Sequence, residues 1–455
     1  MTKHTRKRAL FALLLSLALF AAACGDTRDD DGDTGDTGAT ETDSPTDGGT
    51  ETATDGETAA ECPEPSTGIT ADTIKLGGTY PLSGPASAYG AIGQAVQAYF
   101  EYANGELGGA PGAFEGREFE YVIKDDGYNP PNTVEAVREL VEQEQVFALF
   151  QNLGTPPVAA VWDYVNQQEV PQPFVATGAS LWGLNQEHPW TIGWQPNYVS
   201  ESRVYAQYLK ENHAGSTIAV LYQNDDYGQD YLNGFKSAIE GSDLEIVAEQ
   251  SYETTDATLD SQMTNLAQSE ADVFFNITTP SFAAKAMGFD AQSDWNPVHL
   301  LNSVSNSLTV VGAVGFEPLQ GIVTALYLKD PADEQFQEDE DVQNYMEMLA
   351  EYGPDLDPNN GFAVYGWAVA DSFYKLLEQT ECPTREALQE AWGNLNDVEF
   401  AMALPGITMN TGSDDRFPLE SMQIATLQGE TWELQGDVIN TREVFGPVSE
   451  AVGDG

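Results

Sequence analysis

Strand-like and helix-like segments alternate along most of this chain of 455 residues. Short apolar runs such as Thr217–Tyr222 are typical of buried strands, and segments with apolar residues at helical spacing follow them. The rhythm runs from Ile74 to Trp194 and restarts at Glu201. Repeated strand–helix–strand units form parallel sheets with helices on both faces. Two successive runs therefore predict an α/β protein with two doubly wound, Rossmann-like lobes.

The first run has predicted strands at 74–82, 119–124, 146–153 and 173–177, a short strand or connector at 190–194, and helices at 91–103, 134–141 and 158–166. The second has strands at 217–222, 245–252, 272–277 and 298–301, and helices at 201–212, 232–239, 259–269 and 281–291. A third portion has a strand at 321–328, helices at 335–351, 362–378 and 384–391, and an antiparallel pair at 423–427 and 432–434. This portion is too small for a separate domain, so we expect it to complete both lobes through a hinge with several crossings. Lobe 1 is predicted at 69–196 plus about 326–416, and lobe 2 at 197–325 plus about 417–447.

The N-terminal segment has basic residues first, then a run of apolar residues, and then small residues. Lys3, Arg6, Lys7 and Arg8 precede the run LFALLLSLALFAAA, which is followed by Cys24. This order is typical of a secretory signal, and the run is short for a membrane span. Three alanines before Cys24 resemble the lipobox of bacterial lipoproteins, which implies a signal peptide at 1–23 and a lipid on the Cys24 sulfur. The alternative is an ordinary signal peptide whose cysteine is incidental.

Residues 25–61 are mostly Asp, Thr, Gly, Glu, Ser and Ala. Such a segment buries too little apolar surface to offset its ordering entropy, so we expect residues 24–68 to be a disordered acidic tether behind the lipidated cysteine. The remaining length suits two domains.

The chain carries 73 acidic and 18 basic residues, a net charge of −55. This charge excludes nucleic acid as a partner, because the phosphate backbone would be repelled. The acidic residues are spread along the whole chain, which indicates a surface property. Our hypothesis is an adaptation to a saline or alkaline exterior, where salt screens the self-repulsion.

Two cysteines, Cys62 and Cys382, remain once Cys24 is assigned to the lipid. In an oxidising compartment a disulfide is the default, and it would fasten the end of the tether to the folded body. Two free thiols are the alternative. After residue 24 every apolar stretch is broken by charge or glycine, so we expect membrane attachment through the lipid alone, on the outer face of the cell membrane.

Four segments, taken in order and at their spacings, carry a family resemblance. They are IKLGGTYPLSGPASAYG (74–90), DDGYNPPNTVEAVREL (125–140), FVATGAS (174–180) and IAVLYQNDDYGQDYLNGFK (218–236). Over roughly 69–440 the chain resembles the type I periplasmic substrate-binding proteins, and among them the Leu/Ile/Val-binding-like receptors of ABC importers. The resemblance implies two lobes that close on a small ligand.

The sequence offers little for catalysis. His188, His213 and His299 are isolated, without metal-ligand spacing. There is no Gly-x-Ser-x-Gly elbow, no GxGxxG and no P-loop. We expect no catalytic residue, no metal and no cofactor. An enzyme on this fold is a weaker alternative, which a turnover assay would expose.

Candidate binding residues follow two predicted strands. Ligands of open parallel sheets lie at the carboxyl ends of strands. Thr155 follows the strand 146–153, and we expect it to be the N-cap of a helix that begins at Pro156. Gly178, Ala179 and Ser180 follow the next strand. Backbone N–H groups and hydroxyls there suit a ligand carboxylate. The alternative is that both hydroxyls only cap their own helices.

The resemblance strengthens these assignments, because the family's carboxylate-binding hydroxyls fall on Thr155 and on the turn 178–180. It also places Tyr89 and Tyr227 beside the ligand, where the alternative is simple packing, and points Thr278 toward the cleft. Asn302 stands where amino-acid binders usually carry a glutamate for the ligand's ammonium group. The ligand therefore either finds another acid, such as Asp225 or Asp226, or lacks an ammonium group.

Together these features predict a monomeric lipoprotein that captures a branched-chain amino acid, or a related small amide or carboxylate, and delivers it to an ABC permease. The alternative is a sensor that passes ligand state to a signalling partner. Signalling receptors of this fold usually continue into a transmembrane helix, which is not found before Gly455.

Overall fold

The computed structural model describes residues 62–184, 187–413 and 415–449. The predicted signal peptide, the predicted lipid site at Cys24 and most of the predicted tether lie outside these ranges. The described residues belong to one compact unit.

A parallel sheet in the first third of the chain has the strand order β2-β1-β3. Its strands are β1 (Thr73–Tyr80), β2 (Glu118–Asp125) and β3 (Ala148–Leu149), beside which runs the parallel pair β4 (Gln172–Val175) and β5 (Thr191–Gly193). A bridge between Leu153 and Ala176 joins the two groups into one layer. β3 is shorter than the predicted strand 146–153 because Gln151 has a φ of 61°, which interrupts the ladder.

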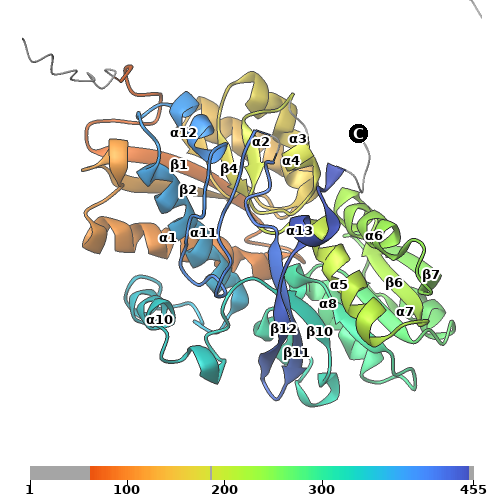
Figure 1. The fold of residues 1–455 in the computed structure, drawn as a ribbon. Coiled ribbons are helices and arrows are strands. Elements are labelled where there is room, and N and C mark those ends of the chain that lie inside the picture. The colour runs from red at the N-terminus through yellow and green to blue at the C-terminus, as the bar shows by residue number, and fades with distance from the viewer. Residues whose placement is uncertain (1–61, 185–186, 414, 450–455) are drawn as a thin grey trace, which may run out of the picture. The chain divides into compact units, whose positions relative to one another are not determined.

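Helices cover this layer. They are α1 (Gly90–Tyr102), α2 (Pro130–Glu142), α3 (Thr155–Gln167), α4 (Leu181–Leu184), α10 (Glu340–Tyr352), α11 (Gly361–Glu378) and α12 (Arg385–Trp392). α11 comes from the far end of the sequence but packs against α1 (Figure 1). Their backbones approach closely at Gly366, where a Cβ atom would lie 2.4 Å from the carbonyl oxygen of Ile92. A glycine is therefore required at this crossing.

A second sheet has the order β12-β11-β10-β9-β8-β6-β7. Its strands are β6 (Thr217–Gln223), β7 (Glu245–Tyr252), β8 (Val273–Ile277), β9 (Val298–Leu301), β10 (Val323–Leu326), β11 (Ser421–Gln428) and β12 (Thr431–Asn440). β6 to β10 are parallel, whereas β11 and β12 form the predicted antiparallel pair at one edge (Figure 1). Every residue of β8 is buried, which is typical of a strand covered on both faces.

The helices of this second layer are α5 (Tyr198–Asn212), α6 (Asp226–Ile239), α7 (Asp260–Ala267), α8 (Pro280–Asp290), α9 (Leu308–Gly312) and α13 (Thr441–Phe445). The chain passes between the two layers after β5, after β10 and before β11. The predicted boundaries of the two lobes stay a prediction.

A disulfide joins Cys62 to Cys382, with their Cα atoms 5.5 Å apart. Next to it, the N–H of Ser66 donates to the carbonyl of Pro383 at 3.1 Å, and the guanidinium of Arg385 donates to the carbonyl of Phe147 at 2.9 Å. The segment before β1 is thereby fastened to the connection between α11 and α12.

Candidate functional site

A cavity lies among residues drawn from both layers. It measures about 990 Å³ with its opening to solvent included. The first layer and its helices supply Tyr89 beside α1, Gly154 before α3, and Phe362 of α11. The second supplies Tyr227 of α6 and the turn that follows β9. Ligand sites of open α/β sheets occur in this position, beyond the ends of parallel strands.

Aromatic side chains dominate the lining. They are Tyr89, Tyr128, Tyr198, Tyr227, Tyr327, Phe362, Tyr365 and Trp432. Burial raises the pKa of Tyr198 to about 12 and places the pKa of Tyr89 and Tyr227 well above the ordinary tyrosine value. Their hydroxyls are therefore neutral near pH 7 and act as hydrogen-bonding groups.

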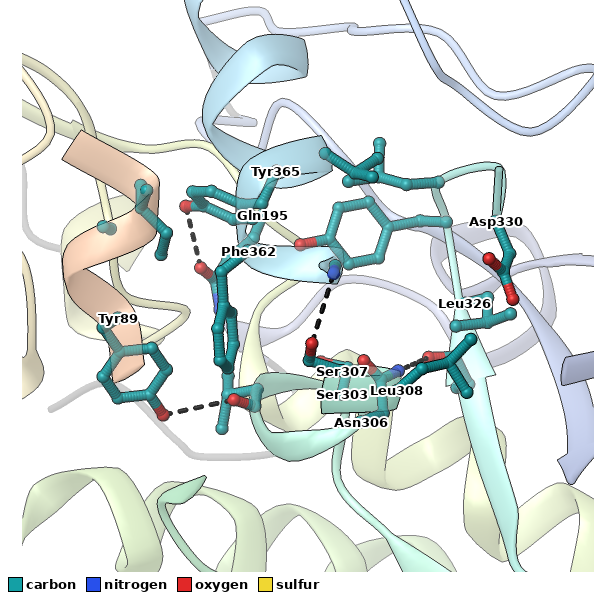
Figure 2. Close-up of a pocket in the computed structure, with 18 of the residues that line it drawn as sticks. Tyr89, Gln195, Ser303, Asn306, Ser307, Leu308, Leu326, Asp330, Phe362 and Tyr365 are labelled. Carbon is teal, nitrogen blue, oxygen red and sulfur yellow. Dashed lines mark hydrogen bonds between the residues drawn. The ribbon is translucent and has the colours of Figure 1, made fainter. Parts of the chain in front are cut away.

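Several polar groups of the lining bond to one another (Figure 2). The hydroxyl of Tyr89 donates to the carbonyl of Val304 at 3.2 Å, and that of Tyr365 donates to the Oε1 of Gln195 at 3.0 Å. The N–H of Gly361 donates to the Oγ of Ser307 at 3.2 Å. These bonds hold the walls in place and leave few polar atoms for a ligand.

Two charged residues, Lys329 and Asp330, line the cavity on the crossing that follows β10. The Nζ of Lys329 lies 2.8 Å from Asp339 and 3.0 Å from Asp341, so its charge is balanced. The Oδ1 of Asp330 accepts the N–H of Ala332 at 2.9 Å, whereas its buried Oδ2 makes no hydrogen bond of good geometry. Burial raises the pKa of Asp330 to about 6, and the backbone N–H groups of Ala332 and Trp432, which lie near the carboxylate, offset part of that rise.

Of the eight predicted ligand-binding residues, Tyr89 and Tyr227 line the cavity. The hydroxyl of Tyr227 accepts the Nδ2 of Asn302. Asn302 itself is fully buried outside the lining, and its Oδ1 has no hydrogen-bond partner. Thr278 is also fully buried outside the lining, and its hydroxyl donates to the Oδ1 of Asn276 at 2.6 Å.

The prediction that Thr155 caps α3 was wrong. Gly154 is the N-cap, with a φ of 98°, and Thr155 is the first helical residue. A Cβ atom at position 154 would lie 2.4 Å from the ring of Tyr128, so the backbone conformation there requires glycine. The hydroxyl of Thr155 bonds instead to that of Thr177, 2.6 Å away, and Thr155 does not line the cavity.

The turn 178–180 holds a carboxylate, but one from this chain. The backbone N–H and the Oγ of Ser180 donate to the carboxylate of Asp230 at 2.6 and 2.7 Å. Gly178 is needed for packing, because a Cβ atom there would lie 2.7 Å from the ring of Tyr198. None of Gly178, Ala179 and Ser180 lines the cavity. The predicted anion-binding geometry is present, and Asp230 fills it.

Sequence reasoning missed several lining residues, among them Gln195, Asp330, Phe362, Tyr365 and Trp432. Phe362 and Tyr365 belong to an apolar helix and look like core residues in the sequence. Asp330 is one acid among 73 in the chain, and nothing local distinguishes it.

Residues 73–431 match the periplasmic binding protein family. The chain belongs to this family. Its predicted resemblance and fold class are confirmed: it is a type I periplasmic binding protein of the Leu/Ile/Val-binding-like group. As a family member it is a substrate-binding protein of the ABC-transporter type and acts outside the cytoplasm.

Solved periplasmic binding proteins share this fold at low identity. A fatty acid ABC transporter substrate-binding protein from Thermomonospora curvata is 23% identical, with a TM-score of 0.70 over 83% of this chain and 95% of that one. A branched chain amino acid ABC transporter protein from Thermus thermophilus, solved with bound valine, is 16% identical, with a TM-score of 0.72 over 83% and 100%. A periplasmic substrate-binding protein from Ralstonia solanacearum is 22% identical, with a TM-score of 0.71 over 80% and 100%. A search of curated proteins finds no match.

Within the described ranges, no group of three or more His, Cys, Asp or Glu side chains is placed to hold a metal ion. No helix in the described part of the chain has the length and apolar character needed to cross a membrane.

Proposed function

We propose that this periplasmic binding protein captures a small amphipathic molecule in the aromatic cavity and presents it to an ABC permease without altering it chemically. The predicted ligand class is a branched-chain amino acid or a related small amide or carboxylate. The observation that carries the proposal is the cavity itself, whose wide aromatic surfaces and few open polar groups suit an apolar body with one polar end. Membership of a binding-protein family supports it.

Closure around the ligand follows from the arrangement of the walls. Tyr89, directly before α1, reaches the turn after β9, and Ser180, in the turn after β4, reaches Asp230 on α6. Both contacts join elements that we assign to different lobes. A hinge motion would break them, open the cavity and let the ligand enter.

A thermal-shift screen tests the proposal. The compounds are amino acids, short amides, urea, small acids and small amines. A ligand that binds only the folded protein raises the melting temperature. We expect at least one compound to do so, and calorimetry then gives its affinity. If every compound leaves the melting temperature unchanged, the proposed ligand class is wrong.

Variants then test the cavity. Tyr89→Ala and Phe362→Ala remove parts of the wall and should each weaken binding by about tenfold, whereas Leu82→Ala changes an exposed side chain and should not. Thr155→Val tests the predicted carboxylate role of that residue. A tenfold loss of affinity would support the role. Unchanged binding would show that the hydroxyl of Thr155 bonds only within the protein, as it does to Thr177, and not to the ligand.

We also propose that the mature protein is anchored to the outer face of the membrane by a lipid on Cys24. The support is the signal-like N-terminus followed by the lipobox-like cysteine. Metabolic labelling with a fatty acid should mark the parent chain and leave Cys24→Ala unmarked. Label on the variant would contradict the anchor.

A further inference from the structure

One carboxylate oxygen of the cavity, the Oδ2 of Asp330, makes no hydrogen bond of good geometry, although the backbone N–H of Trp432 lies near the carboxylate. Among the described residues, a small set of buried side-chain nitrogens and oxygens makes no hydrogen bond, and of the residues in that set only Asp330 lines the cavity. An unsatisfied buried acceptor is costly, and the cost is greater when the group is charged. The Oδ2 of Asp330 is therefore an acceptor that a ligand can satisfy.

The surrounding charges favour a cationic partner. Lys329, the neighbouring cation of the lining, is held by Asp339 and Asp341, and no hydrogen bond or ion pair joins it to the described atoms of Asp330. Tyrosine and tryptophan rings line the same cavity, and their faces attract cations. The net charge of −55 adds a field that draws cations toward the protein and repels anions.

The positions predicted to bind the ammonium group and the carboxylate of an amino-acid ligand are occupied differently in this chain. The ammonium position carries the neutral Asn302, whose Nδ2 is directed to Tyr227. The carboxylate turn at Ser180 is filled by Asp230. Asp330 lies on the crossing after β10, at the opposite side of the view from Tyr89 (Figure 2). Neither predicted position therefore offers a ligand an open charge.

We propose that Asp330 binds a protonated nitrogen of the ligand, so that the ligand is a small amine or amino compound whose apolar body lies against the aromatic walls. This inference rests on the proposed function and names the chemistry of its ligand. A charge-assisted bond to the Oδ2 would satisfy that oxygen, and such bonds are roughly twice as strong as neutral ones. A ligand carboxylate is not required.

Calorimetry with three probes that share one branched hydrocarbon body tests the inference. Isopentylamine has the nitrogen alone, isocaproate has the carboxylate alone, and L-leucine has both. We expect the parent chain to bind isopentylamine at least about tenfold more tightly than isocaproate. Asp330→Asn keeps the shape and removes the charge, so it should weaken isopentylamine binding by about tenfold or more. The control is Glu334→Gln, which removes an exposed charge on the same crossing and should leave binding unchanged.

Several outcomes would overturn the inference. They are tighter binding of isocaproate than of isopentylamine to the parent, no binding of isopentylamine, or equal binding of the amine by the parent and Asp330→Asn. The probe preference of the parent is independent of how the variant folds, and a melting curve of Asp330→Asn checks its fold. The proposed function survives these outcomes if another compound of the thermal-shift screen binds, so the two failures are distinguishable.

Discussion

Glu201 is a buried carboxylate that shapes the cavity without lining it. It is fully buried on α5 and accepts the N–H and the Oγ of Ser303, both at 2.6 Å. It also accepts the hydroxyls of Tyr231 and Tyr205 at 2.6 and 2.9 Å. Burial raises its pKa, and these hydrogen bonds offset part of that rise. Through its bonds to Ser303, Glu201 positions the turn after β9, and Ser303 lines the cavity.

We expect Glu201→Gln to lower the free energy of unfolding by about 1–3 kcal/mol, because an amide cannot accept all of these donors. Urea unfolding measures the change. Glu211→Gln is the control, since Glu211 is exposed on the same helix. Equal unfolding free energies for the parent and Glu201→Gln would show that the donors find other acceptors.

Asp230 gives a pH-dependent contribution to stability. Burial raises its pKa to about 6, the hydrogen bonds from Ser180 oppose the rise, and the charge of Asp226 adds to it. An unfolded aspartate has a pKa of about 3.9. The folded state therefore binds the proton of Asp230 more tightly than the unfolded state does. The contribution of this protonation to the free energy of unfolding is complete below about pH 4 and is lost as the pH rises through 6.

The expected result is a pH-dependent difference between the parent and Asp230→Asn. The free energy of unfolding of the parent, minus that of the variant, should fall by on the order of 1 kcal/mol between about pH 4 and 7. The subtraction removes the contributions of Asp330 and Glu420, whose pKa values are also raised. A difference that is constant with pH would contradict the raised pKa of Asp230.

At the scale of elements, the start of α3 depends on Gly154. Its positive φ turns the chain from β3 into the helix, and the ring of Tyr128 occupies the space beside its Cα. Since Tyr128 lines the cavity, the helix start and the aromatic wall are coupled.

Gly154→Ala should therefore combine backbone strain with a steric clash. Gly116→Ala separates the two effects, because Gly116 has a φ of 81° and nothing within 4 Å of its Cβ position. We expect Gly154→Ala to lower the free energy of unfolding by about 1–3 kcal/mol more than Gly116→Ala, in denaturant unfolding curves. Equal losses would mean that the ring of Tyr128 moves aside freely.

For the whole molecule, the acidic surface sets how stability responds to salt. With 73 acidic and 18 basic residues, repulsion opposes the folded state. Raising sodium chloride from about 0.1 M to about 1 M shortens the Debye length from about 10 Å to about 3 Å. We expect the melting temperature to rise over this range. A melting temperature that does not change with sodium chloride concentration would refute the saline-adaptation hypothesis.

The disulfide joins residues separated by 320 positions. Replacing both Cys62 and Cys382 by serine should lower the free energy of unfolding by about 2–4 kcal/mol, because the unfolded chain loses a long closed loop. Non-reducing mass analysis of the secreted parent should show the linked peptides. Free thiols at both positions in that analysis would contradict the bond.

Apolar spacing in the sequence was enough to predict the longer helices and strands and the fold class, but not the short helices α4, α9 and α13. The helix predicted at 362–378 is α11 (Gly361–Glu378), and the strand predicted at 272–277 is β8 (Val273–Ile277). These assignments succeed because a helix or strand buries one face or both, and the buried face determines the spacing of apolar residues along the sequence. The alternation of elements then restricts the layers that can form.

Only the tertiary structure decided which polar groups meet. Ser180 has the hydroxyl and the turn of an anion site, but Asp230, fifty residues further along, supplies the anion. Asp330 becomes part of the cavity because the crossing after β10 brings it beside Trp432 of β12 and the turn after β9. A hydroxyl or carboxylate bonds to whatever partner lies within about 3 Å, and distances between segments far apart in the chain are set by packing rather than by local sequence.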